Sequence, residues 1–224
     1  MRVPLIPSLG AAVLLAAGAA PLVAQALPTT QPKIIQIFRE RIKPGMDAAH
    51  EANESGWPQA FAAANSSSYY LALESMTGDS EVLFIAPYES YTAWDKANAE
   101  DGANAELSAT LDRLWAADGP YLESADAIEA VAAPNLGHGA FPDLNQQRFW
   151  NITLYRVRPG HRSELVEAVA RYKEIVTRAG STANWRIYRV TGGMPSGMYL
   201  IFSSVAAFGI STQLWPTMSS SDRP

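Results

Sequence analysis

Apolar positions along the chain form short β-rich runs that alternate with longer stretches of helical periodicity. The pattern occurs twice. One β-rich run at 34–38 and another at 149–155 are each followed by a helical stretch, then two strand-like segments, then the start of a second helical stretch. The other predicted strands cover residues 69–76, 81–86, 124–132, 185–190 and 198–202.

Short sequence matches indicate that this order comes from an internal duplication. RIKPG at 41–45 recurs as RVRPG at 156–160, a spacing of 115 residues. A Thr-Gly pair and an Ala-aromatic pair further along each half recur at a spacing of 114 residues. We therefore predict two units, at 33–132 and 148–224, each with the β-α-β-β-α-β order of a ferredoxin-like arrangement. A stretch at 133–147, rich in Pro, Gly and Asn and without periodicity, is the predicted linker.

The R-[IV]-[KR]-P-G turn between the first strand and the first helix of each unit resembles that of the dimeric α/β-barrel superfamily, and within it the NIPSNAP-like proteins. The resemblance covers about 34–131 and 148–212. It implies an α+β fold in which two tandem ferredoxin-like units pack sheet against sheet into a barrel. Families that share this fold include cofactor-free monooxygenases, haem-degrading enzymes and many secreted proteins with no assigned activity.

The second unit departs from the pattern at its end. Only 16 residues follow Phe208, too few for a complete second helix and a fourth strand. We therefore predict that this unit lacks its last strand. An unpaired strand edge favours pairing with another chain, so a homo-oligomer is expected.

The first 26 residues have the composition of a secretory signal peptide. Arg2 precedes an apolar stretch at 9–20, and Ala24 and Ala26 supply the small residues that signal peptidase requires. The apolar stretch is shorter than the ~20 residues of a membrane-spanning helix. We predict cleavage after Ala26, a secreted or periplasmic mature protein, and no membrane association after cleavage.

Charge and cysteine content exclude several partners and chemistries. The chain has 17 Lys and Arg against 22 Asp and Glu, a formal net charge of -5, so nucleic acid is not an expected partner. It has no Cys, which excludes disulfides, thiol catalysis, cysteine-ligated zinc and iron–sulfur clusters. Three scattered histidines predict no metal site, and no catalytic motif is present.

Candidate site residues come from a comparison of the first helices of the two units. In the second unit the inward stripe is apolar, consisting of Leu165, Ala168, Tyr172 and Val176. At the 115-residue offset, the first unit has His50, Asn53, Trp57 and Phe61. Burial of an unpartnered polar side chain costs roughly 1–3 kcal/mol. The two polar residues therefore need either hydrogen-bond partners or a ligand.

The sequence Gly56-Trp57-Pro58 interrupts this helix, because Pro lacks a backbone donor. A kink there opens a cavity between helix and sheet, so we predict that His50, Asn53, Trp57 and Phe61 line a site for a small apolar ligand. Alternatively, His50 and Asn53 are solvated by rotation of the helix or are bonded to backbone near the kink.

Three classes of function remain open. The first is a secreted or periplasmic protein that binds a small apolar ligand, with no cofactor. The second is a cofactor-free monooxygenase or a haem enzyme, in which His50 serves as base or axial ligand. The third is an oligomeric assembly module without a ligand.

Overall fold

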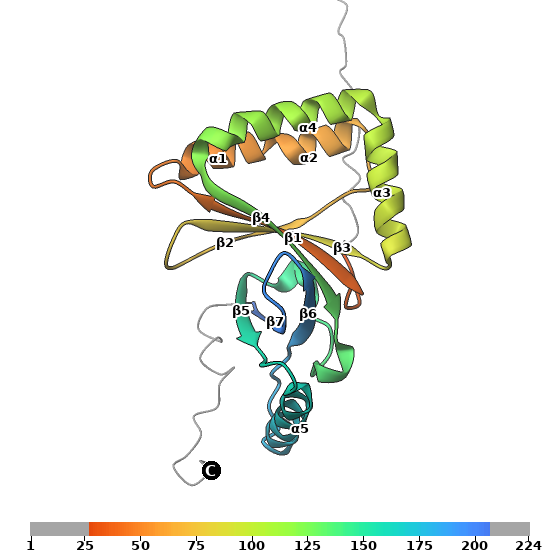
Figure 1. The fold of residues 1–224 in the computed structure, drawn as a ribbon, viewed down its shortest axis with the longest axis vertical. Helices are drawn as coiled ribbons and strands as arrows, with labels where there is room; N and C mark the ends of the chain where they lie inside the picture. Colours follow the sequence, from red (N-terminus) through yellow and green to blue (C-terminus); the bar gives the residue numbers. More distant parts are fainter. Residues whose placement is uncertain (1–26, 207–224) are drawn as a thin grey trace, which may run out of the picture.

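A computed structural model describes residues 27–206, which contain one antiparallel sheet of seven strands in the order β2-β3-β1-β4-β6-β7-β5. The sheet curls into a half-barrel (Figure 1). Each strand overlaps a predicted segment. The strands are β1 (Ile34–Ile42), β2 (Leu71–Glu74), β3 (Glu81–Tyr88), β4 (Leu122–Ala132), β5 (Phe149–Arg156), β6 (Arg186–Gly192) and β7 (Met198–Val205).

The helices lie on the outer side of the half-barrel (Figure 1). They are α1 (Asp47–Glu54), α2 (Gly56–Ala63), α3 (Tyr91–Ala103), α4 (Ala105–Asp118) and α5 (Arg162–Arg178). Helix α4 packs against α1 and α2, whereas α5 lies beside β5, β6 and β7. The predicted interruption is confirmed, since α1 ends at Glu54 and α2 begins at Gly56. Within residues 27–206, no helix combines the length and apolar character needed to cross a membrane.

The RIKPG motif at 41–45 ends β1 and turns the chain toward α1, as its Pro and Gly residues indicate. Pro44 follows the end of β1, where a residue without an amide donor removes no ladder hydrogen bond. Gly45 has a φ of 80°, a left-handed conformation that favours glycine. The chain thereby turns sharply from β1 into α1.

The face of the sheet opposite the helices carries the core that unites the two halves. Its buried residues come from β1, β4, β6 and β7, namely Ile35, Ile37, Ile128, Ala130, Tyr188, Val190, Leu200 and Phe202. Pairing of β4 with β6 joins the two halves into one sheet, with Glu129 opposite Gly192. Gly193 follows directly, and a Cβ atom there would lie 1.9 Å from the carbonyl oxygen of Ala127. Only glycine permits this close approach.

The helix layer of the first half buries few side chains. In α1 only His50 is buried, in α2 none is, and in α4 only Leu107 and Asp118 are. Beneath them, Ile42, Val82 and Phe84 form a small separate cluster on the sheet. The helices of the first half therefore contribute less to the core than the sheet does.

The predicted linker is held against β6. The His138 ring stacks on Trp185 with 4.7 Å between ring centroids, and Trp185 Nε1 donates to the Leu136 carbonyl at 3.0 Å. Arg186 Nη1 donates to the His138 carbonyl at 2.6 Å. The segment thus has a fixed position, although its sequence shows no periodicity.

The architecture is α+β, and residues 34–132 follow the ferredoxin-like order of two helices and four strands, with each of the two helical regions divided in two. Within residues 27–206, β2 and β5 form the two edges of the sheet. The second helix expected from 207 onward lies outside the described residues. The duplication and the barrel formed by two such units therefore stay predictions.

Candidate functional site

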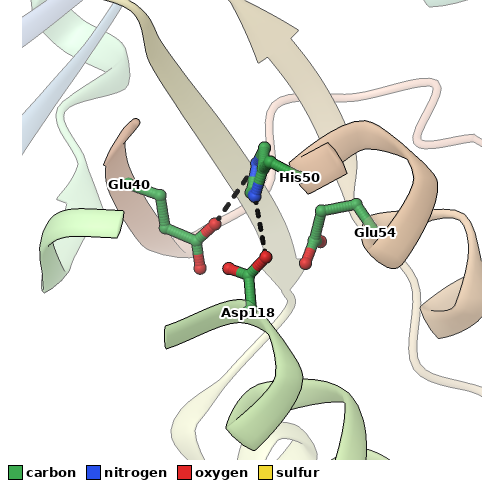
Figure 2. A group of neighbouring side chains, drawn as sticks. All are labelled: Glu40, His50, Glu54 and Asp118. Atoms are coloured by element: carbon green, nitrogen blue, oxygen red, sulfur yellow. Dashed lines mark hydrogen bonds and ion pairs between the residues drawn. The ribbon is translucent and has the colours of Figure 1, made fainter. Parts of the chain in front are cut away.

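Four ionisable side chains of the first half converge between its helices and the sheet. Glu40 comes from β1, His50 and Glu54 from α1, and Asp118 from the last residue of α4 (Figure 2). One nitrogen or oxygen atom from each of the four lies within 4.8 Å of the others. We call this group the histidine–carboxylate cluster.

Local structure explains why these residues meet. Side chains alternate along a strand, so Glu40 points to the helix side of β1 while Ile35 and Ile37 point to the core on the other face. His50 and Glu54 are four residues apart on α1, which places them on one side of that helix. Asp118 lies at the end of α4, which packs along α1.

His50 contacts two of the carboxylates. Its Nδ1 lies 2.9 Å from Asp118 Oδ1, and its Nε2 lies 3.6 Å from Glu40 Oε2. Because an ionised carboxylate only accepts hydrogen bonds, we assign the Nδ1 proton to the bond with Asp118. Asn53 supports the same carboxylate, since its Nδ2 donates to Asp118 Oδ1 at 3.3 Å and to the Leu114 carbonyl at 3.1 Å.

The cluster is buried and its hydrogen bonding is incomplete. The exposed fraction is 2% for His50, 4% for Glu40 and 0% for Asp118. Seven buried side-chain atoms in residues 27–206 lack a hydrogen-bond partner, and three of them belong to this cluster: His50 Nε2, Glu40 Oε2 and Asp118 Oδ2. Such atoms normally find partners in folded proteins, so their concentration at one place indicates a functional site.

Burial also alters the acidity of the two glutamates. Desolvation, with a smaller effect of the Asp118 carboxylate, raises the pKa of Glu40 to about 7, and His50 acts in the opposite direction. Desolvation, followed by the charges of Glu40 and Asp118, raises the pKa of Glu54 to about 8. Near neutral pH the two glutamates therefore hold protons that isolated carboxylates would have lost.

Part of this group is predictable from the sequence. His50 and Asn53 are both in or beside the cluster, and their partners are protein groups. Trp57 and Phe61 lie on α2, with their rings 6.4 Å apart between centroids. Ligand contact by these four residues stays a prediction. Glu40, Glu54 and Asp118 were missed, although the spacing of His50 and Glu54 on one helix face was a usable signal.

A separate cavity of about 250 Å³ lies between α5 and the sheet, in the second half of the chain. We call it the α5 cavity. Leu165, Ala168 and Tyr172 of α5 line one side, and Trp185 and Ile187 line the sheet side. The inward stripe predicted for this helix thus faces a cavity between helix and sheet.

Comparisons with known proteins identify the fold. No family model matches the chain, and no curated protein does. Among solved structures, a "putative monooxygenase" from Fusobacterium nucleatum is similar at a TM-score of 0.56 and 11% identity, covering 82% of this chain and 80% of its own. An anthrone oxidase-like protein is similar at a TM-score of 0.55 and 9% identity, covering 88% and 83%.

A NIPSNAP domain protein from Burkholderia xenovorans also matches, at a TM-score of 0.37 and 16% identity, over 45% of this chain and 94% of its own. At these identities the likeness concerns the fold alone. The chain therefore has the α+β, ferredoxin-like type of fold seen in the first two of these structures.

Proposed function

We propose that this protein binds a small apolar molecule in the α5 cavity. The observation that carries the proposal is the cavity itself, which is partly open to solvent and has a volume of about 250 Å³ between a helix and a sheet. Pockets for small molecules typically have volumes of roughly 300–1,000 Å³, so this one, which lies slightly below that range, suits a small ligand.

The lining matches an apolar ligand with a polar end. Trp185 and Ile187 form a buried floor, exposed by only 7% and 1%. Polar groups are few, and Thr153, Asn184, Ser203 and the two tyrosines supply most of them. Burial, together with the neighbouring Tyr155 phenol, raises the pKa of Tyr172, so this phenol stays protonated and can donate or accept a hydrogen bond at neutral pH.

The position of the cavity favours binding over acid–base catalysis. Tyrosines are the only titratable side chains among its lining residues in the described part of the chain. The histidine–carboxylate cluster comes from residues 40–118, whereas the cavity is lined by residues 153–203. A ligand in the cavity therefore lies against apolar, hydroxyl and amide groups, which can hold and orient it.

Oxygenase activity is the second candidate, favoured by the His50–Asp118 pair. An imidazole whose Nδ1 is held by a buried carboxylate can act as a general base through Nε2. Here His50 Nδ1 lies 2.9 Å from Asp118 Oδ1. Oxygen uptake in the presence of a bound ligand, lost in His50→Ala, would support this candidate.

The binding proposal can be tested with N-phenyl-1-naphthylamine, a neutral apolar fluorophore that brightens when it leaves water. We expect saturable binding to the wild-type protein and an increase in its melting temperature. Ala168→Trp places an indole in the cavity, and overpacking of about 1–3 kcal/mol weakens binding about 5-fold or more.

Ala170→Trp is the matched control, because Ala170 is also exposed on α5 but faces a different side of the helix. It should bind the probe as the wild type does. The proposal is wrong if the wild type shows no saturable binding, or if both tryptophan variants bind equally well.

A further inference from the structure

We propose that Glu40, His50, Glu54 and Asp118 bind a divalent metal ion, with Zn²⁺ bound more tightly than Mn²⁺. The inference is independent of the α5 cavity, because the residues that line the two sites do not overlap.

The geometry of the cluster is close to that of a coordination sphere. Carboxylate and imidazole ligands bind Zn²⁺ at about 2.0–2.2 Å, so two ligand atoms of one ion lie at most about 4.4 Å apart. In the cluster, the four candidate atoms all lie within 4.8 Å of one another. Small rotations of the two glutamate side chains close this difference.

The atoms without hydrogen-bond partners supply a second, independent argument. His50 Nε2, Glu40 Oε2 and Asp118 Oδ2 are buried, and none has a hydrogen-bond partner in residues 27–206. Figure 2 shows the carboxyl groups gathered around the His50 imidazole. A cation among them would satisfy all three atoms at once.

The orientation of His50 matches that of a metal ligand. Metal-binding histidines commonly donate their other ring N–H to a carboxylate, which fixes the ring and makes the free nitrogen more basic. Here the Nδ1 of His50 is 2.9 Å from Asp118 Oδ1, and Asn53 donates to that same oxygen. The Nε2 atom is thereby presented to Glu40, the side on which the ion would bind.

The charges of the cluster also favour a bound cation. In the described part of the chain, no Lys or Arg forms an ion pair with Glu40, Glu54 or Asp118, and the close contacts of Glu40 and Asp118 are with the His50 imidazole. Buried carboxylates without a fixed positive partner are typical of metal sites. One imidazole with three carboxylates suits Zn²⁺ or Mn²⁺ better than Ca²⁺, which prefers six to eight oxygen ligands.

The test uses the full untagged chain, freed of metal by chelation and titrated with Zn²⁺ by calorimetry and native mass spectrometry. We expect one Zn²⁺ per chain and a raised melting temperature. Mn²⁺ should bind at the same site, as shown by competition with Zn²⁺ and by its electron paramagnetic resonance signal. No stoichiometric binding of either ion to the wild type would overturn the proposal.

Variants decide whether the ion is held by this cluster. Glu54→Gln removes a ligand charge at a half-buried position, and Glu51→Gln makes the same change at an exposed position of the same helix. Loss of an outer-shell group costs about 10–100-fold in metal affinity, so removal of a ligand should cost at least about 100-fold. Equal Zn²⁺ affinity in the two variants would overturn the proposal.

His50→Gln provides a second test, with folding checked by circular dichroism. Loss of Zn²⁺ binding in a folded His50→Gln protein supports the site, whereas unchanged binding overturns it. Should His50→Gln not fold, Glu54→Gln against Glu51→Gln decides alone. Probe binding in the α5 cavity should be unchanged in Glu54→Gln, which separates failure of one proposal from failure of the other.

Discussion

The raised pKa of Glu40 makes the stability of the metal-free protein depend on pH in an unusual direction. A carboxyl group whose pKa is higher in the folded state binds more protons folded than unfolded. The free energy of unfolding therefore falls as pH rises from the unfolded pKa to the folded one. For Glu40 these limits are 4.5 and about 7. Most carboxylates in salt bridges have the opposite effect, because their folded pKa is lowered.

The size of the effect follows from the shift. One pKa unit corresponds to about 1.4 kcal/mol, so Glu40 alone removes on the order of 3 kcal/mol of stability between pH 4.5 and 7. Glu54, which is less buried, extends the decline toward pH 8. The lowered pKa of Asp47 acts only at more acidic pH, so it leaves this window unaffected.

The measurement is urea unfolding followed by circular dichroism at several pH values from 4.5 to 8, with a chelator present. Glu40→Gln carries a neutral side chain of nearly the same shape, so its free energy of unfolding should change much less across this range. A wild-type free energy that is flat or rises with pH would refute the reasoning. So would a Glu40→Gln protein with the wild-type slope.

Two further substitutions test the packing. Gly193→Ala should cost about 3 kcal/mol or more, because its Cβ would lie 1.9 Å from a carbonyl oxygen, while Gly45→Ala, with a similar φ and open space around it, should cost about 1–2 kcal/mol. Equal losses in urea unfolding would show that the contact across β4 and β6 is not tight. Arg39→Ala removes a 2.6 Å ion pair with Glu81 and should cost no more than about 1 kcal/mol, less in high salt. A loss above about 2 kcal/mol, unaffected by salt, would contradict this estimate.

The sequence predicted the sheet better than the site because strands leave a local signal. Alternation and β-branched residues are readable within one segment, as at β1, and the Pro-Gly turn at Gly45 marks where it ends. The sheet order and the closing of β4 against β6 depend on contacts about 60 residues apart, such as Glu129 with Gly192. No local pattern records such a pairing.

In the site, too, some residues have a local sequence signal and others do not. His50 and Asn53 could be singled out because they interrupt an otherwise apolar helix stripe. Glu40 lies in a strand whose apolar residues on the other face give the strand its sequence pattern, so nothing local marks Glu40 as a site residue. Asp118 is 68 residues from His50 in the chain. A buried carboxylate at a helix end looks, in sequence, like any solvated one. Only the packing of α4 on α1 reveals that it faces an imidazole.

The sparse burial by α1, α2 and α4 has a consequence for motion. Local opening requires the least free energy where few apolar contacts must be broken, and these helices bury only His50, Leu107 and Asp118. The helix layer should therefore open more often than the sheet beneath it, in partial unfolding events that leave the seven strands paired. Each such event would bring water to the cluster. The rate of these openings, rather than diffusion through the folded protein, would then limit how fast a cation enters or leaves.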